Sequence, residues 1–159
     1  MILVTLGTND KKFTRLIEAV ENAAKDGLLS GHIVVQAGFT EYHSDILEVI
    51  DYIDQRQFAE YMNQADLIIT HGGVGTIMTA LKEHKKILAA ARLQKYGEHV
   101  NDHQTQLLES FDEQGYLIYM KDLSDIAPYI KKAETFEPRE LVSHRDHMVR
   151  LVSDWIDSH

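Results

Sequence analysis

The sequence predicts one α/β domain, a doubly wound parallel sheet with helices on both faces. Short apolar runs alternate along the chain with stretches whose apolar residues recur at helical spacing. The runs are almost uninterrupted in apolar residues, which is typical of strands buried on both faces. Strands that alternate with helices pair in parallel through right-handed crossovers. The 159 residues, of which 44% are hydrophobic, suffice for a single core, so we assign residues 1–159 to one domain.

The short apolar runs are the expected strands. Each run ends at a glycine or at a polar turn, which interrupts the apolar pattern. In chain order, the strands are expected at residues 2–6, 32–37, 66–70, 87–91 and 116–120. Residues 40–56 are less regular, and their apolar residues fit either a short strand or a helix.

The stretches between these runs carry the pattern of amphipathic helices. The first helix is expected over residues 13–24, because Phe13, Leu16 and Val20 share one of its faces. Gly27 then stops this pattern, as glycine often does at the end of a helix. Further helices are expected at residues 58–65, 76–84, 102–114 and 124–132.

The end of the chain carries a separate amphipathic stripe. Apolar residues recur there at i, i+3, i+4, i+7 and i+8, namely Met148, Leu151, Val152, Trp155 and Ile156. They predict a helix over residues 145–158. This helix either packs on the sheet of its own domain or reaches across to a partner subunit.

The composition excludes several classes of function. Sixteen Lys and Arg residues against 25 Asp and Glu residues leave a net charge of −9, which opposes binding to nucleic acid or an anionic membrane. The chain has no cysteine, so disulfides, zinc–thiolate sites and cysteine nucleophiles are excluded. No apolar run approaches the ~20 residues of a membrane span, and residues 1–10 lack the basic region of a signal peptide. We therefore expect a cytoplasmic protein.

A glycine-rich turn between a strand and a helix is the strongest local motif. The segment IITHGGVGT takes the strand into a turn at Gly72 and opens a helix near Gly75. Glycines let the backbone approach a ligand closely, and the N–H groups of a helix N-terminus attract a pyrophosphate. Thr76 either caps the helix or donates its hydroxyl to a ligand. The segment is neither a Walker loop nor a dinucleotide fingerprint, so a plain connection remains an alternative.

A second cluster, GEHVNDHQ at residues 97–104, is rich in side chains that form specific hydrogen bonds. A loop followed by a helix cap explains Asn101 and Asp102 but not the histidines, Glu and Gln beside them. Sugar hydroxyls held by paired hydrogen bonds explain the whole set. A metal held by His99 and His103 is the alternative, although the spacing supplies no third ligand.

The turn after the first strand is the third candidate element. It contains Gly7, Thr8 and Asn9, and either Asn9 or Asp10 caps the next helix or the turn belongs to a site. Loops that follow parallel strands meet at the carboxyl edge of the sheet, where doubly wound domains bind their ligands. We therefore expect the loops at Gly7, Gly38, residues 72–75 and residues 92–101 to gather at one edge.

These elements, taken together, resemble those of a known family. The motifs VTLGT, ADLIITHGGVGTIMTAL, GEHVNDHQ and GYLIY, within residues 1–125, look like the donor-binding half of a GT-B glycosyltransferase of family 28. They are similar to the single-domain catalytic subunits of two-component transferases that use dolichyl- or undecaprenyl-linked acceptors, the bacterial members of which serve capsule and exopolysaccharide synthesis. The resemblance implies a Rossmann-like domain that binds a UDP-sugar.

The resemblance also implies a partner and a reaction. A membrane-attached subunit would bind the acceptor, a sugar on a polyprenyl-pyrophosphate carrier, and would recruit the chain to the inner face of the membrane. The hexose would be transferred with inversion and without a metal ion or other cofactor. The C-terminal helix would help to dock the partner, and without that partner the chain is expected to form homodimers through the same stripe. The alternatives are a non-catalytic subunit that binds the nucleotide sugar, and an unrelated hydrolase or metal enzyme.

Site residues follow from the matched motifs. The resemblance implies that the diphosphate is bound by Gly72, Gly73, Gly75 and Thr76. It implies that the donor sugar and phosphate are contacted by Asn101, Asp102, His103 and Gln104. It also implies that the cleft is lined by Gly7, Thr8 and Asn9. It makes His71 and Glu98 the candidate catalytic residues, with His71 at the mouth of the glycine turn. One departure is Thr79, because related transferases carry a ribose-binding glutamate there. A hydroxyl cannot accept both hydrogen bonds of a diol as a carboxylate can.

Overall fold

The fold is a six-stranded parallel sheet between two layers of helices. The computed structural model describes residues 1–7, 12–92 and 103–139. The elements are β1 (Ile2–Thr5), α1 (Thr14–Lys25), β2 (Ile33–Gln36), β3 (Glu48–Ile50), α2 (Gln55–Gln64), β4 (Leu67–His71), α3 (Val74–Lys82), β5 (Lys86–Ala90), α4 (His103–Glu113), β6 (Ile118–Tyr119) and α5 (Ala127–Thr135). All strand pairs are parallel, in the order β3-β2-β1-β4-β5-β6. The predicted fold class is confirmed.

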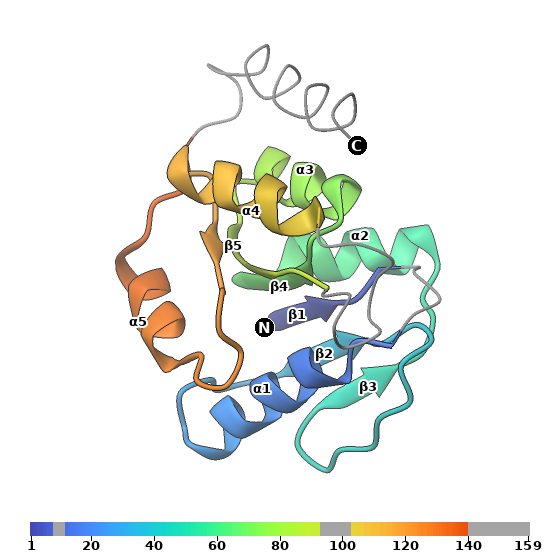
Figure 1. Cartoon of the computed structure of the whole chain (residues 1–159). Helices are drawn as coiled ribbons and strands as arrows, with labels where there is room; N and C mark the ends of the chain where they lie inside the picture. The colour runs from blue at the N-terminus through green and yellow to red at the C-terminus, as the bar shows by residue number, and fades with distance from the viewer. Residues whose placement is uncertain (8–11, 93–102, 140–159) are drawn as a thin grey trace.

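The strands are apolar because both faces of the sheet are covered. On one face, Val4 and Val35 pack with the buried sides of α1 and α5. On the other face, Leu3 and Val34 pack with α2, α3 and α4. Figure 1 shows α2, α3 and α4 along one side of the strands and α1 along the other. Adjacent residues of a strand point to opposite faces, so each apolar run supplies both cores.

The strand order places a topological switch point between β1 and β4. From β1 the chain proceeds through α1 to β2 and β3, whereas from β4 it proceeds the other way through α3 and α4 to β5 and β6. The helices next to β1 and β4 therefore cover opposite faces. Doubly wound domains bind their ligands outside the carboxyl ends of the strands at such a switch point.

Several predicted boundaries are corrected by the structure. His71 is the last residue of β4, not part of the turn, and α3 begins at Val74 with Gly73 as its N-cap residue. Thr76 lies inside the first turn and does not cap the helix. Apolar periodicity missed these boundaries because strand pairing extends β4 by one residue, and glycine can occupy an N-cap without a side chain.

The irregular segment at residues 40–56 contains β3, a strand of three residues at the edge of the sheet. Its exposed edge position explains the weak apolar pattern. The next helix, α2, begins at Gln55 rather than at residue 58. Asp54 is its N-cap residue, and the Asp54 carboxylate accepts a hydrogen bond of 2.7 Å from the backbone N–H of Gln57.

The start of α1 also differs from the expectation. Phe13 is the N-cap residue, whereas the sequence suggests Asn9 or Asp10, which lie outside the described residues. The backbone N–H of Phe13 donates instead to Thr40 Oγ1, at 2.9 Å, on the loop that follows β2. The helix predicted over residues 145–158 lies outside the described residues. Within the described part of the chain, no helix has the length and apolar character needed to cross a bilayer.

A hydrogen-bonded cluster ties the segment between β2 and β3 to α1. The Tyr42 hydroxyl donates to the Glu21 carboxylate, and Ser44 Oγ donates to the same carboxylate at 2.9 Å. The hydrogen bond from Tyr42 is the main reason that the pKa of Glu21 lies below its usual value. Burial, together with the bond to Glu21, raises the pKa of Tyr42 from 10.0 to about 12.

This cluster predicts an alkaline dependence of stability that Tyr42→Phe removes. A tyrosine whose pKa is raised by folding stabilises the protein fully below its unfolded pKa of 10.0, and this contribution is lost as the pH rises through about 12. The difference in free energy of unfolding between the wild type and Tyr42→Phe should therefore shrink from pH 10 to pH 12. Urea titrations of both proteins measure it. Parallel stability curves over this range would contradict the prediction.

Candidate functional site

The His71 ring is enclosed by two glycines at the switch point. A methyl group added at Gly7 would lie 2.3 Å from His71 Nε2, and one added at Gly73 would lie 2.4 Å from His71 Cε1. Gly7 also has a φ of +71°, which side chains rarely adopt. The ring is only 8% exposed. The turns after β1 and β4 thus meet around one imidazole, and both turns require glycine.

The N-terminus of α3 opens beside this ring. None of the described residues caps the helix at Gly73 with its side chain, so the N–H groups of the first turn are suited to an external acceptor. A methyl group added at Gly75, in the first turn, would meet no atom of the described residues within 4 Å. As far as the described part of the chain shows, this turn leaves room for a ligand such as a phosphate group.

Buried polar side chains concentrate at the carboxyl ends of the strands. Among the described residues they are Thr5, Gln36, Thr40, Thr70, His71, Arg92 and Gln104. Each of them lies at the end of a strand, in the loop that follows it, or in the first turn of α4. Burying a polar group costs free energy unless the group is hydrogen-bonded. The concentration of these side chains at one edge therefore indicates a role other than filling the core.

Gln36 fastens the loops of three strands to one another. Thr5 Oγ1 donates to Gln36 Oε1 at 2.8 Å. Gln36 Nε2 in turn donates to the carbonyl oxygens of Gly7, at 3.3 Å, and Asp51, at 3.4 Å. Thr70 Oγ1 on β4 donates to the Thr5 carbonyl at 3.2 Å. The backbone at Gly7 is therefore held by side chains from β1 and β2.

Arg92 likewise connects the loops of separate strands by hydrogen bonds, on the other side of the switch point. It follows β5, is 1% exposed, and donates from Nη2 to the carbonyl oxygen of Leu6 at 2.8 Å. Its backbone N–H donates to Gln104 Oε1 at 3.1 Å. Gln104 packs against Gly72, since a methyl group added at Gly72 would lie 3.0 Å from that same oxygen. Arg92 and Gln104 thus connect β1, β5 and α4 behind the glycine turn.

Two guanidinium groups bring positive charge to this edge. Those of Arg15 and Arg92 each lie 5.0 Å from the centre of the Phe13 ring, a cation–π arrangement. Arg15 Nη2 also donates to the Ala91 carbonyl at 2.6 Å. In a chain with a net charge of −9, this pair raises the local potential at the carboxyl edge of the sheet.

Sequence reasoning selected neither arginine. The available signal was an arginine placed directly after the apolar strand at residues 87–91, at the carboxyl edge where ligands bind. Arg15, in contrast, belongs to an ordinary amphipathic helix. Only the packing of α1 against the sheet brings it to the Ala91 carbonyl.

The structure brings part of the predicted site together. Gly7, His71, Gly72, Gly73 and Gln104 converge at the edge, as the predicted gathering of loops requires. Gly75 and Thr76 lie in the first turn of α3, and His103 begins α4. Thr8, Asn9, Glu98, Asn101 and Asp102 lie outside the described residues. Among the residues that are described, no group of three or more His, Asp and Glu side chains is placed to hold a metal ion.

Thr79 occupies an exposed position one helical turn after Gly75. Its Oγ1 donates to the Gly75 carbonyl at 2.9 Å, within α3. This bond occupies the hydroxyl proton of Thr79, so toward a ligand the side chain offers an acceptor oxygen only.

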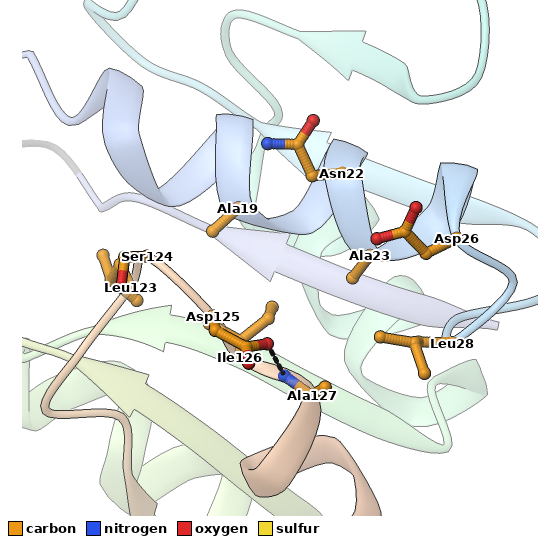
Figure 2. A pocket seen from close by; sticks show the side chains of 10 residues that line it. All are labelled: Ala19, Asn22, Ala23, Asp26, Leu28, Leu123, Ser124, Asp125, Ile126 and Ala127. Atoms are coloured by element: carbon orange, nitrogen blue, oxygen red, sulfur yellow. Dashed lines mark hydrogen bonds between the residues drawn. The ribbon is translucent and has the colours of Figure 1, made fainter.

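A small pocket elsewhere in the molecule does not belong to this edge. It lies between α1 and the segment that leads into α5, and it is lined by Ala19 and Ala23 on one side and Leu123 and Ile126 on the other (Figure 2). The Asp125 carboxylate accepts a hydrogen bond from the backbone N–H of Ala127 there. Its volume of about 60 Å³ is far below the several hundred Å³ typical of ligand sites.

The strand order and the layers of helices define a doubly wound α/β domain with a switch point between β1 and β4. Residues 1–149 match the sequence profile of the family described as "Glycosyltransferase family 28 C-terminal domain", and the chain belongs to this family.

Solved structures agree with this fold. The chain is similar to the NMR solution structure of ALG13, with a TM-score of 0.63, 18% identity, and coverage of 94% of this chain and 93% of that one. It is also similar to the glycotransferase of kitacinnamycin, with a TM-score of 0.62 and 21% identity over 97% of this chain. The chain spans 37% of the length of that second protein. No curated protein matches the sequence significantly.

Proposed function

We propose that this chain binds a UDP-sugar at the switch-point edge and transfers the hexose to a sugar carried on polyprenyl pyrophosphate. The observation that carries the proposal is the uncapped N-terminus of α3 beside the ring of His71, which Gly7 and Gly73 enclose. Membership of a glycosyltransferase family makes a nucleotide sugar the ligand that such an anion site serves.

The diphosphate of the donor is assigned to the first turn of α3. Gly72, Gly73 and Gly75 let the backbone approach the phosphates, and Thr76 supplies a hydroxyl in the same turn. The guanidinium groups of Arg15 and Arg92 add positive potential to the edge. Helix N–H groups and arginines can stabilise the departing UDP without a metal ion.

The sugar of the donor is assigned to the segment before α4 and to its first residues. Asn101, Asp102, His103 and Gln104 supply the hydrogen-bonding groups that its hydroxyls require. Thr8 and Asn9, next to Gly7, line the cleft. Inversion needs a base near the acceptor hydroxyl, and Glu98 and His71 are our candidates. His71 is nearly enclosed, which favours a place beside the phosphates for it and leaves Glu98 as the base.

The acceptor is assigned to a second, membrane-attached subunit, which would hold this chain at the inner face of the membrane. Support comes from the family description, which refers to a C-terminal domain, while this chain forms one donor-type sheet. Residues 145–158 are the proposed docking helix, and homodimers are expected when the partner is absent.

A second function, a non-catalytic subunit that holds the nucleotide sugar for another transferase, is favoured by one observation. Thr79 stands where related transferases carry a glutamate for the ribose, and its hydroxyl proton is already bonded to the Gly75 carbonyl. A site without that carboxylate would hold the ribose less tightly.

Calorimetric titration of the chain with UDP, and with ADP as the matched control, tests the proposal. We expect heat of binding with UDP and none, or much less, with ADP, because the base and ribose contacts distinguish the nucleotides. If UDP fails to bind both to the chain alone and to its complex with the partner, the proposal is wrong. If UDP binds but the complex transfers no sugar, the non-catalytic function holds.

A further inference from the structure

Two aromatic side chains stand exposed on the rim of the same edge. Phe39, in the loop after β2, is 64% exposed, and Tyr52, directly after β3, is 76% exposed. They are the most exposed of the large apolar side chains in the described residues. Single exposed apolar residues are ordinary, but two exposed aromatic residues on adjacent loops at one edge of a sheet are typical of a binding surface.

Hydrogen bonds connect the backbone next to Phe39 and Tyr52 to the turn at Gly7. Gly38, which precedes Phe39, donates from its backbone N–H to the Asp51 carbonyl at 2.8 Å. The side chain of Gln36 bonds to the carbonyl oxygens of both Gly7 and Asp51. A methyl group added at Gly38 would lie 3.1 Å from the Gly7 carbonyl oxygen. The backbones that carry the rings are therefore fastened to the turn that encloses His71.

The charges around the two rings select the kind of ligand. Glu41, Asp51 and Asp54 are exposed within two residues of Phe39 or Tyr52. These carboxylates repel an anionic bilayer, and they accept hydrogen bonds from hydroxyl groups. A neutral pyranose ring suits both features of this surface. Its C–H groups can pack on the π face of an aromatic ring, and its hydroxyl groups can donate hydrogen bonds to carboxylates.

We propose that Phe39 and Tyr52 form a platform for the acceptor sugar, a neutral pyranose, on the rim beside the donor site. The inference rests on the proposed function, because a sugar transferase needs a second sugar at the same edge as its donor. The donor-side chain would then contribute directly to acceptor binding, in addition to the partner subunit.

NMR titration of the ¹⁵N-labelled full chain, saturated with UDP, tests the platform. The probes are methyl β-glucopyranoside and methyl β-N-acetylglucosaminide. We expect chemical-shift changes at residues 38–41 and 51–54, and a loss of affinity of about two- to tenfold for each of Phe39→Ala and Tyr52→Ala. Ile46→Ala is the matched control, since Ile46 is an exposed apolar residue, 46% exposed, that precedes β3 whereas Tyr52 follows it. UDP affinity should be unchanged in all three variants.

The outcomes separate this inference from the proposed function. If UDP does not bind to the chain or to its complex, the proposed function fails. If UDP binds but neither sugar shifts residues 38–41 and 51–54, or if Phe39→Ala and Tyr52→Ala bind the sugars as the wild type does, the platform is wrong. Shifts at these residues with phosphatidylserine vesicles or with rising protein concentration, in the absence of a sugar response, would assign the surface to a membrane or to a second copy and also overturn it.

Discussion

Gly73→Ala is expected to lower the affinity for UDP at least tenfold and the free energy of unfolding by about 1–3 kcal/mol. The added methyl group would lie 2.4 Å from Cε1 of His71, and that ring cannot retreat because Gly7 encloses it on another side. The turn must therefore shift, and the first N–H groups of α3 shift with it. Calorimetry with UDP and urea denaturation measure the two effects.

Gly75→Ala is the matched control for this prediction. Its methyl group would meet no atom of the described residues within 4 Å, so stability should hold or rise by up to about 1 kcal/mol through the better helix propensity of alanine. UDP affinity should nevertheless fall, because the open space above Gly75 is assigned to the diphosphate. Unchanged UDP binding in Gly75→Ala would show that the diphosphate does not bind at this turn.

A double substitution tests whether the His71 ring is the cause. In the presence of His71→Ala, the change Gly73→Ala should cost little stability, because the methyl group no longer meets the imidazole. The two substitutions should therefore be coupled by about 1 kcal/mol or more in a double-mutant cycle. Additive effects would show that the enclosure of His71 does not determine the requirement for glycine.

Arg92→Met is expected to destabilise the protein by about 3 kcal/mol or more. The substitution retains much of the side-chain volume but leaves the buried Leu6 carbonyl without its 2.8 Å partner, and it removes the cation from the Phe13 ring. UDP affinity should also fall, since Leu6 precedes the Gly7 turn. Arg92→Lys should recover part of the stability, because an ammonium group can still donate to a carbonyl oxygen but lacks the planar guanidinium.

Arg139→Met is the matched control for Arg92. Arg139 also lies over an aromatic ring, 5.7 Å from the centre of Tyr116, but it is exposed and far in sequence from the edge loops. Its substitution should change stability by no more than about 1 kcal/mol and leave UDP affinity unchanged. Equal losses in the two variants would mean that burial at the edge gives Arg92 no special role.

Local patterns in the sequence were sufficient for the fold class and for most elements. The apolar runs of β1, β2, β4 and β5 were recognised because a strand buried on both faces is apolar over its whole length. The apolar pattern at the edge strand β3 fits either a strand or a helix, because partial exposure weakens it. The beginning of α3 was placed two residues late, because Gly73 caps the helix without a side-chain signal.

The sequence predicts only those residues of the candidate site that belong to a local motif. The glycine turn and Gln104 were selected from the sequence, and the structure brings them to the edge where Gly7 also lies. Arg15, Arg92 and Gln36 were not selected, because each acts through a bond to the backbone of another strand or loop. A local sequence pattern contains no information about a hydrogen-bond partner on a distant strand or loop.

The sequence by itself determined that the chain forms an alternating α/β domain with a glycine-rich turn ahead of a helix, since apolar periodicity and glycine spacing are properties of neighbouring residues. Only the tertiary structure decided that β1 lies beside β4, and hence that Gly7 and Gly73 enclose the same imidazole. It also decided that Arg92 is buried against Leu6. These are contacts between segments far apart in the chain, and they exist only once the strands have paired in their final order.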